Sequence, residues 1–156
     1  MAIPKYTRVA IRSKEFGTYL SLNGTGVNHF RDGGWPNTVK TIGHLKSWET
    51  FYVHHNDDNT VSFEATQFPN AYLRLDGNGV RAGVNAPGGT VNTQYGSLGW
   101  EKFHIRRQDD STPIVAIESA SFPGRFLRVD NRNVANVQGV NLSWEKFEIF
   151  YLPPKA

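Results

Sequence analysis

Apolar and polar residues alternate along most of the chain at a period of two. In Tyr72-Leu73-Arg74-Leu75 and in Phe103-His104-Ile105 every second side chain is apolar, and clusters of Gly, Pro or Asn interrupt the pattern at the spacing expected of short strands. Such alternation places the apolar side chains on one face of a strand. No segment keeps apolar residues at helical spacing over three turns. The sequence therefore predicts an all-β protein of about twelve short strands.

Three segments of the chain can be laid over one another as copies of one pattern. Each copy opens with an apolar alternation, followed seven residues after its first Val by Phe16, Phe68 or Phe122. A tight turn then leads into a strand expected at residues 19–22, 72–75 and 126–129. Each copy closes with Trp-Glu-X-Phe, at residues 48–51, 100–103 and 144–147. We predict one domain, residues 1–156, with repeats at about 7–56, 60–108 and 113–152.

The three copies are expected to share a single core. A four-stranded unit cannot bury its apolar face alone, and three copies are fewer than the blades of a propeller. Closing the strands into one barrel would also remove the exposed sheet edges.

At these residues the chain resembles a β-trefoil. The resemblance implies three pseudo-symmetric four-stranded repeats that form a six-stranded barrel with a hairpin cap. Segments 62–74 and 118–128 are similar to the arabinose-binding domain of fungal arabinofuranosidases, and also to fascin-like trefoils, which bundle actin. The arabinose-binding family places a His after Tyr-Leu-Arg, where this chain has Leu75 and Val129. That family's sugar contacts therefore do not carry over.

The fold resemblance implies a non-catalytic, lectin-like protein whose partners are glycans or glycoconjugates. The fascin-like resemblance leaves actin filaments as an alternative partner. A third alternative is a trefoil protease inhibitor that presents residues 28–47 or 81–99 as a rigid loop.

Composition excludes several other classes of function. The 17 Lys and Arg and the 14 Asp and Glu are scattered along the chain, so no basic block predicts nucleic-acid binding. No apolar run approaches the roughly 20 residues that would predict membrane insertion. Cysteine is absent, and the first residues lack the apolar stretch of a signal peptide, so a cytoplasmic location is expected.

Catalytic motifs are missing from the sequence. The five histidines show no spacing typical of a metal site: His29, His44, His54, His55 and His104. Gly96-Ser97-Leu98-Gly99 falls short of a nucleophile elbow. We therefore predict no enzyme, no catalytic residues, no metal and no cofactor.

The three Trp-Glu-X-Phe elements allow two interpretations. An indole can stack on a sugar while a nearby carboxylate accepts its hydroxyl protons. Alternatively, an aromatic residue at the same place in every repeat is what a threefold core requires, with the Glu pairing to a neighbouring strand or capping a turn. The second interpretation is favoured.

Features that break the threefold symmetry are better indicators of a ligand, because the barrel does not require them. Residues 28–47 and 81–99 are predicted as long loops with no counterpart in the third copy. The first contains Asp32 and Trp35 in a Gly-Gly setting, and the second contains Tyr95. Loops of this kind often carry function, although Trp35 could instead fold back on the barrel.

Polar residues also follow the second strand of every copy. They are expected from turn chemistry alone, but their threefold placement would permit three shallow sites that gain from multivalency. Together with the loop residues, they make up the predicted sugar-binding set: Trp35, Asp32, Asn23, Asp76, Asn78, Tyr95, Asp130 and Asn131.

Overall fold

The structure is a computed structural model that describes residues 7–22, 39–42, 49–67, 70–76, 90–95, 99–108, 113–129, 135–138 and 145–152. The first repeat contains the strands β1 (Thr7–Ser13), β2 (Tyr19–Leu22), β3 (Val39–Ile42) and β4 (Phe51–His55). The second contains β5 (Val61–Ala65), β6 (Ala71–Asp76), β7 (Thr90–Tyr95) and β8 (Phe103–Arg107), with a turn of 3-10 helix, η2 (Gly99–Glu101), before β8. The third contains β9 (Ile114–Ser119), β10 (Phe126–Val129), β11 (Ala135–Gln138) and β12 (Phe147–Tyr151). No helix in this part of the chain is long and apolar enough to cross a membrane.

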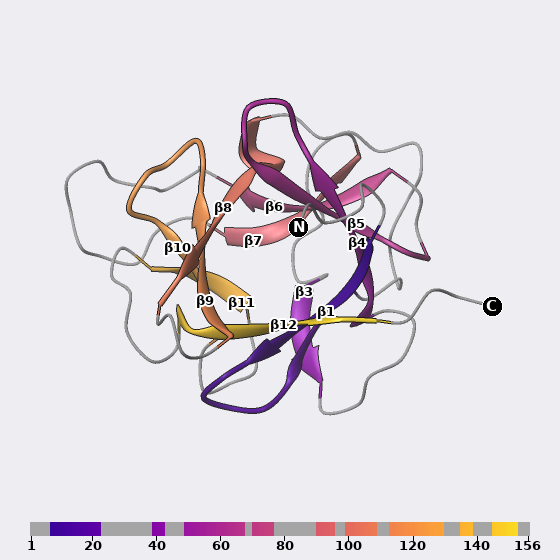
Figure 1. The fold of residues 1–156 in the computed structure, drawn as a ribbon, viewed down its shortest axis with the longest axis vertical. Coiled ribbons are helices and arrows are strands. Elements are labelled where there is room, and N and C mark those ends of the chain that lie inside the picture. The colour runs from indigo at the N-terminus through magenta and orange to yellow at the C-terminus, as the bar shows by residue number, and fades with distance from the viewer. Residues whose placement is uncertain are drawn as a thin grey trace.

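Six of these strands close into an antiparallel barrel. β1 pairs with β4 and β12, β5 pairs with β4 and β8, and β9 pairs with β8 and β12. Figure 1 shows the six strands arranged as a ring. Because each strand of the ring has a partner on both sides, the barrel has no open edge, and its inward side chains meet in one core.

The other six strands form three hairpins, β2–β3, β6–β7 and β10–β11. Each hairpin is attached to the first barrel strand of its own repeat, since β2 pairs with β1, β6 with β5 and β10 with β9. The hairpins also meet one another: β7 pairs with β11, and β3 contacts both. The predicted six-stranded barrel with its hairpin cap is confirmed.

The three repeats pair in the same register. Between successive repeats, the Phe of each Trp-Glu-X-Phe element lies opposite a small residue: Phe51 opposite Ala65, Phe103 opposite Ser119 and Phe147 opposite Ser13. Within each repeat, the same Phe lies opposite the opening Val: Val9, Val61 and Val115. The repetition read from the sequence is therefore also a repetition of strand pairing.

The Phe residues of the three closing strands are central to the core. Phe51, Phe103 and Phe147 have no exposed surface, and the neighbouring Phe63 is equally buried. The rings of Phe63 and Phe103 lie 6.0 Å apart in a tilted arrangement. Burying one such side chain contributes about 1.5–3 kcal/mol, so these residues carry much of the apolar stabilisation of the barrel.

A tight turn joins the barrel to the hairpin in every repeat, and among the described residues of each turn one has a positive φ: Gly17, Asn70 and Gly124. Gly and Asn tolerate this conformation best. A carboxylate holds the turn in two repeats, because Glu64 accepts a hydrogen bond from the Asn70 N–H at 2.6 Å and Glu118 accepts one from the Gly124 N–H at 2.8 Å. In the first repeat Arg12 stands at the same position, and its Nε donates to the carbonyl of the turn glycine at 3.3 Å.

The prediction of two long loops was wrong in part. The ranges 28–47 and 81–99 contain β3 and β7, and both strands have a counterpart in the third repeat, β11. The first hairpin ladder ends with the pair Leu22–Val39 and the third with Val129–Ala135. The equivalent pair of the second ladder is Leu75–Val91, and this ladder continues by one more pair, Asp76–Thr90. The extra residues of the first two repeats therefore lie between the two strands of a hairpin.

We predict that truncation of the three core Phe residues has equal effects. Phe51→Ala, Phe103→Ala and Phe147→Ala should each lower the free energy of unfolding by about 3–5 kcal/mol, as expected for a buried ring. Urea unfolding followed by circular dichroism measures the loss. Phe150→Ala is the control, because this ring is 39% exposed and its loss should cost about 1 kcal/mol. The three positions would not be equivalent if one variant lost less than a third of the free energy of unfolding that the other two lose.

We predict a pH-dependent contribution from Glu118. Burial alone would raise the pKa of this carboxyl, but the hydrogen bond from the Gly124 N–H and the ion pair with Arg106, at 2.7 Å, together lower the pKa below its ordinary value of 4.5. A lowered pKa stabilises the fold above the pKa of the unfolded chain, and the gain is lost as the pH falls through the folded pKa.

Glu118→Gln should therefore cost about 1 kcal/mol at pH 7 and much less at pH 3, measured by urea unfolding at both values. The matched control is Glu15→Gln, at an exposed position, which should change little at either pH. A cost for Glu118→Gln that is the same at both values would show that the carboxylate charge is not involved.

Candidate functional site

The predicted sugar-binding residues fall mostly outside the described residues. Six of them do so: Asn23, Asp32, Trp35, Asn78, Asp130 and Asn131. Two lie on strands of the second hairpin, where the backbone is described. Asp76 is the last residue of β6 and pairs with Thr90, whereas Tyr95 is the last residue of β7 and pairs with Ala71.

The structure does not bring Asp76 and Tyr95 together. They belong to pairs at the two ends of the β6–β7 ladder, five residues apart along β6, which is about 17 Å of extended strand. Tyr95 was predicted in a loop and lies in a strand instead. A single sugar ring therefore does not contact both residues.

The three hairpin ladders nonetheless share one register. Leu22, Leu75 and Val129 occupy the same place in them. In the sequence these residues are followed by Asn23, Asp76 and Asp130, and we call these three sequence positions the hairpin ends. A repeated binding site requires a common register of this kind.

Trp100 packs as a structural residue. Its ring lies against Phe122 of the next repeat, with centroids 5.8 Å apart, and the guanidinium of Arg74 lies 4.8 Å from the ring centroid. Phe122 in turn packs against the core. Trp100 therefore joins the second repeat to the third, as the core interpretation predicts. Trp48 and Trp144 lie outside the described residues.

The carboxylates of the Trp-Glu-X-Phe elements are withdrawn from solvent. Glu49, Glu101 and Glu145 expose only 3%, 2% and 2% of their surface. Glu49 Oε2 accepts a hydrogen bond from Ser21 Oγ at 2.6 Å, which ties the start of the closing barrel strand to β2. A charge removed from water is tolerated only when it is paired in this way. These carboxylates are not available to accept the hydroxyl groups of a sugar.

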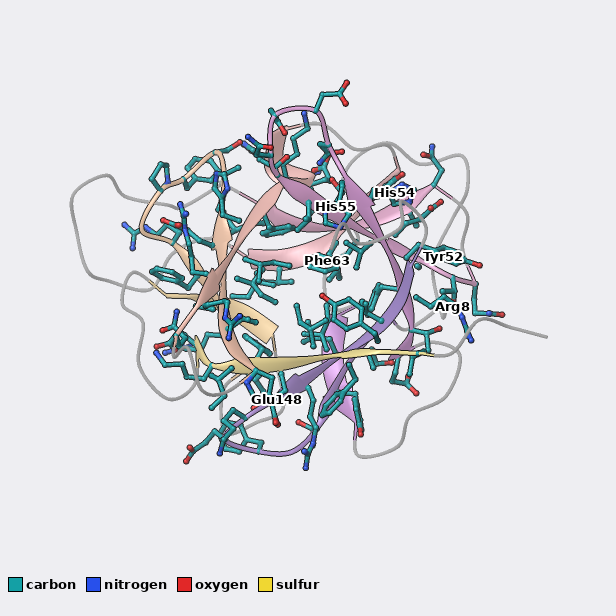
Figure 2. The ribbon with its side chains drawn as sticks, viewed as in Figure 1. Arg8, Tyr52, His54, His55, Phe63 and Glu148 are labelled. Atoms are coloured by element: carbon teal, nitrogen blue, oxygen red, sulfur yellow. The ribbon has the colours of Figure 1, made fainter. Side chains whose placement is uncertain are left out.

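The adjacent histidines of β4 have different surroundings, and Figure 2 labels both. His54 Nε2 lies 2.7 Å from Glu64 Oε1, and its ring tilts against Tyr72 with centroids 5.6 Å apart. His55 is exposed. Within the described ranges, no group of three or more His, Asp and Glu side chains could hold a metal ion.

Sequence reasoning searched the loops and passed over the end of the last barrel strand. Phe150 and Tyr151 on β12 are 39% and 55% exposed. The repeat alignment carries the signal, since Phe150-Tyr151 stands where the first repeat has His54-His55 and the second has Arg106-Arg107.

Comparison of the chain with known proteins identifies its fold. No protein-family model and no curated protein sequence matches it. Among solved structures, SeviL bound to an asialo-GM1 saccharide matches with a TM-score of 0.72 over 95% of this chain and 99% of that one, at 9% identity. The designed 3-fold symmetric protein ThreeFoil matches with a TM-score of 0.66 over 93% of this chain and 99% of that one, at 13% identity.

The chain is a β-trefoil. A third match, the ricin B-like lectin of Macrolepiota procera in complex with lactose, has a TM-score of 0.65 over 97% of this chain and all of that one, at 13% identity. Identities this low establish the β-trefoil architecture and not the ligand.

For this β-trefoil we predict that Trp100 serves stability. Trp100→Ala should lower the free energy of unfolding by about 2–4 kcal/mol, because the contacts with Phe122 and Arg74 are lost. Trp100→Phe keeps part of the ring packing and should cost less than half as much. Urea unfolding measures both variants. Unchanged stability in Trp100→Ala would show that the indole does not join the repeats.

Proposed function

We propose that this β-trefoil is a non-catalytic, lectin-like protein that binds glycans through its hairpin ends, and that it acts in the cytoplasm. The observation that carries the proposal is the identical register of the three hairpins. In the sequence, Asn23, Asp76 and Asp130 directly follow the equivalent ladder residues Leu22, Leu75 and Val129. Side-chain amides and carboxylates are the groups that exchange hydrogen bonds with neighbouring sugar hydroxyls.

The structural matches support the same proposal. SeviL was solved with an asialo-GM1 saccharide and the Macrolepiota procera lectin with lactose, and both match almost the entire length of this chain. A scaffold that has been solved twice with a bound saccharide favours saccharide binding here, as an argument from fold. No observation favours the actin-binding or protease-inhibitor alternatives, which stay predictions.

The non-catalytic part of the proposal rests on the buried carboxylates. Glycoside hydrolysis needs two carboxyl groups that flank a sugar at a surface. The three Glu residues that recur in every repeat are more than nine-tenths buried, and Ser21 engages one of them. They serve the packing of the barrel.

Screening on a glycan array tests the proposal. We expect the wild-type chain to bind at least one class of glycan, and Trp35→Ala and Asp76→Ala to weaken that binding about tenfold or more, as the loss of a ring contact or a charged acceptor predicts. Asp57→Ala is the matched control. It removes the same side chain from an exposed turn between two barrel strands and should leave binding unchanged.

Two outcomes would contradict the proposal. One is the absence of binding across the array by a chain whose unfolding curve shows it to be folded. The other is equal loss of binding in Asp57→Ala and Asp76→Ala, which would point to general charge and not to the hairpin ends.

A further inference from the structure

One row of the hairpin cap joins polar positions from two repeats. Asp76, the last residue of β6, pairs with Thr90 of β7, and Thr90 also pairs with Asn136 of β11. β7 lies between the other two strands in the order of the sheet (Figure 1). Residues that lie directly opposite one another in an antiparallel sheet share one face. We call Asp76, Thr90 and Asn136 the cap row.

The cap row belongs to the face of the sheet that does not line the core. Leu75 and Val91 are buried, and strand alternation puts their neighbours Asp76 and Thr90 on the opposite face. The pair with Thr90 places Asn136 on that face too. The three polar positions therefore form a line across three strands on one side of the cap.

The cap row departs from the threefold symmetry of the scaffold. In the described part of the chain, the first hairpin ladder ends at Leu22–Val39 and the third at Val129–Ala135, whereas the second continues by one pair. β3 contacts β7 and β11, but among the described residues the pairing between hairpins of different repeats is that of β7 with β11. Within these residues, the cap row therefore has no counterpart that involves the first repeat.

We propose that the cap row makes the second hairpin end a composite site, built from two repeats, that binds neutral glycans of two or more sugar units. This inference rests on the proposed function, because Asp76 is one of the hairpin ends. An Asp carboxylate accepts hydrogen bonds, whereas a Thr hydroxyl and an Asn amide both donate and accept them. Sugar hydroxyls also donate and accept, so every position of the row offers one of them a partner.

The spacing of the strands sets the size of the ligand. Neighbouring strands lie about 4.8 Å apart, so the backbone positions of Asp76 and Asn136 are about 10 Å apart. A single sugar ring can engage Asp76 with Thr90, or Thr90 with Asn136, and a disaccharide can lie across all three strands. Because pairing fixes the backbone at these positions, little of its conformational freedom is lost when a ligand binds.

The charge of the cap row selects a neutral ligand. Asp76 is its charged member, and a sugar carboxylate placed against it would be repelled. The arginines beside the row already have partners. The guanidinium of Arg74 lies 4.8 Å from the centroid of the Trp100 ring, and Arg128, which pairs with Asn136, interacts with other residues of the chain. Neither arginine is therefore a free cation that would attract an acidic sugar.

Binding curves on a glycan array test this inference. The array carries galactose, glucose and N-acetylglucosamine, the neutral disaccharides lactose, cellobiose and chitobiose, and the acidic glycans 3′-sialyllactose and digalacturonic acid. We expect at least one neutral disaccharide to bind about tenfold more tightly than its monosaccharide and than the acidic glycans, because it gains a further hydrogen-bonded position. Thr90→Val and Asn136→Ala should each weaken that binding about fivefold, as the loss of one hydrogen bond predicts.

Two further variants keep the result interpretable. Thr90→Ser keeps the hydroxyl and should restore most of the binding that Thr90→Val loses, which a general disturbance of the strand would not allow. Gln94→Ala is the matched control for Asn136→Ala. It removes an amide from β7 at the position paired with Tyr72, four residues from Thr90, and should leave binding unchanged.

The outcomes separate the cap row from the proposed function. Monosaccharides that bind as tightly as the disaccharides, stronger binding of the acidic glycans, no binding of any neutral disaccharide, or equal loss in Gln94→Ala would each overturn the inference. Binding that is lost in Asp76→Ala and kept in both Thr90→Val and Asn136→Ala would rule out the cap row and leave the hairpin ends as the site. A folded chain that binds no glycan at all contradicts both proposals.

Discussion

The rest of the structure depends on closing six strands into a barrel in one register, repeated three times. A strand that slipped by one residue would turn its apolar side chains outward, so the pairs that fix the register matter more than any other contact. In each repeat one Phe makes two of these pairs: Phe103, for example, lies opposite Val61 within its repeat and opposite Ser119 of the next. The small residue leaves room for the ring. Core packing and ring closure are thus determined by the same side chain.

The turns show how a threefold scaffold tolerates different chemistry. Glu118 holds its turn by accepting a backbone N–H, whereas Arg12 at the same position of the first repeat donates to a backbone carbonyl. Both bonds hold a turn that has the same positive-φ geometry. The barrel therefore constrains the backbone conformation of the turn more tightly than the charge of the side chain that holds it. That side-chain charge differs between repeats.

The fold could be predicted from the sequence because its main determinant repeats. The opening Val and the Phe seven residues later keep their spacing in all three repeats, and every repeat closes with Trp-Glu-X-Phe. The opening Val and the Phe of the closing element are buried in each repeat. Strands β3 and β7 could not be predicted in the same way, because they pair with other cap strands and lie beside insertions of different length. The burial of Glu101 could not be predicted from the sequence either, because a charged residue is normally expected at the surface.

Symmetry also helps to separate residues that serve stability from residues that serve binding. Every repeat has a Trp at the position of Trp100, and Trp100 is held by Arg74 and Phe122. The repetition of this Trp therefore reflects the needs of the barrel. Phe150 occurs once, at a position where the other repeats manage with His54 and Arg106, and it stays exposed. An exposed ring loses the free energy that burial would provide. Phe150 is therefore not a residue that the threefold barrel requires.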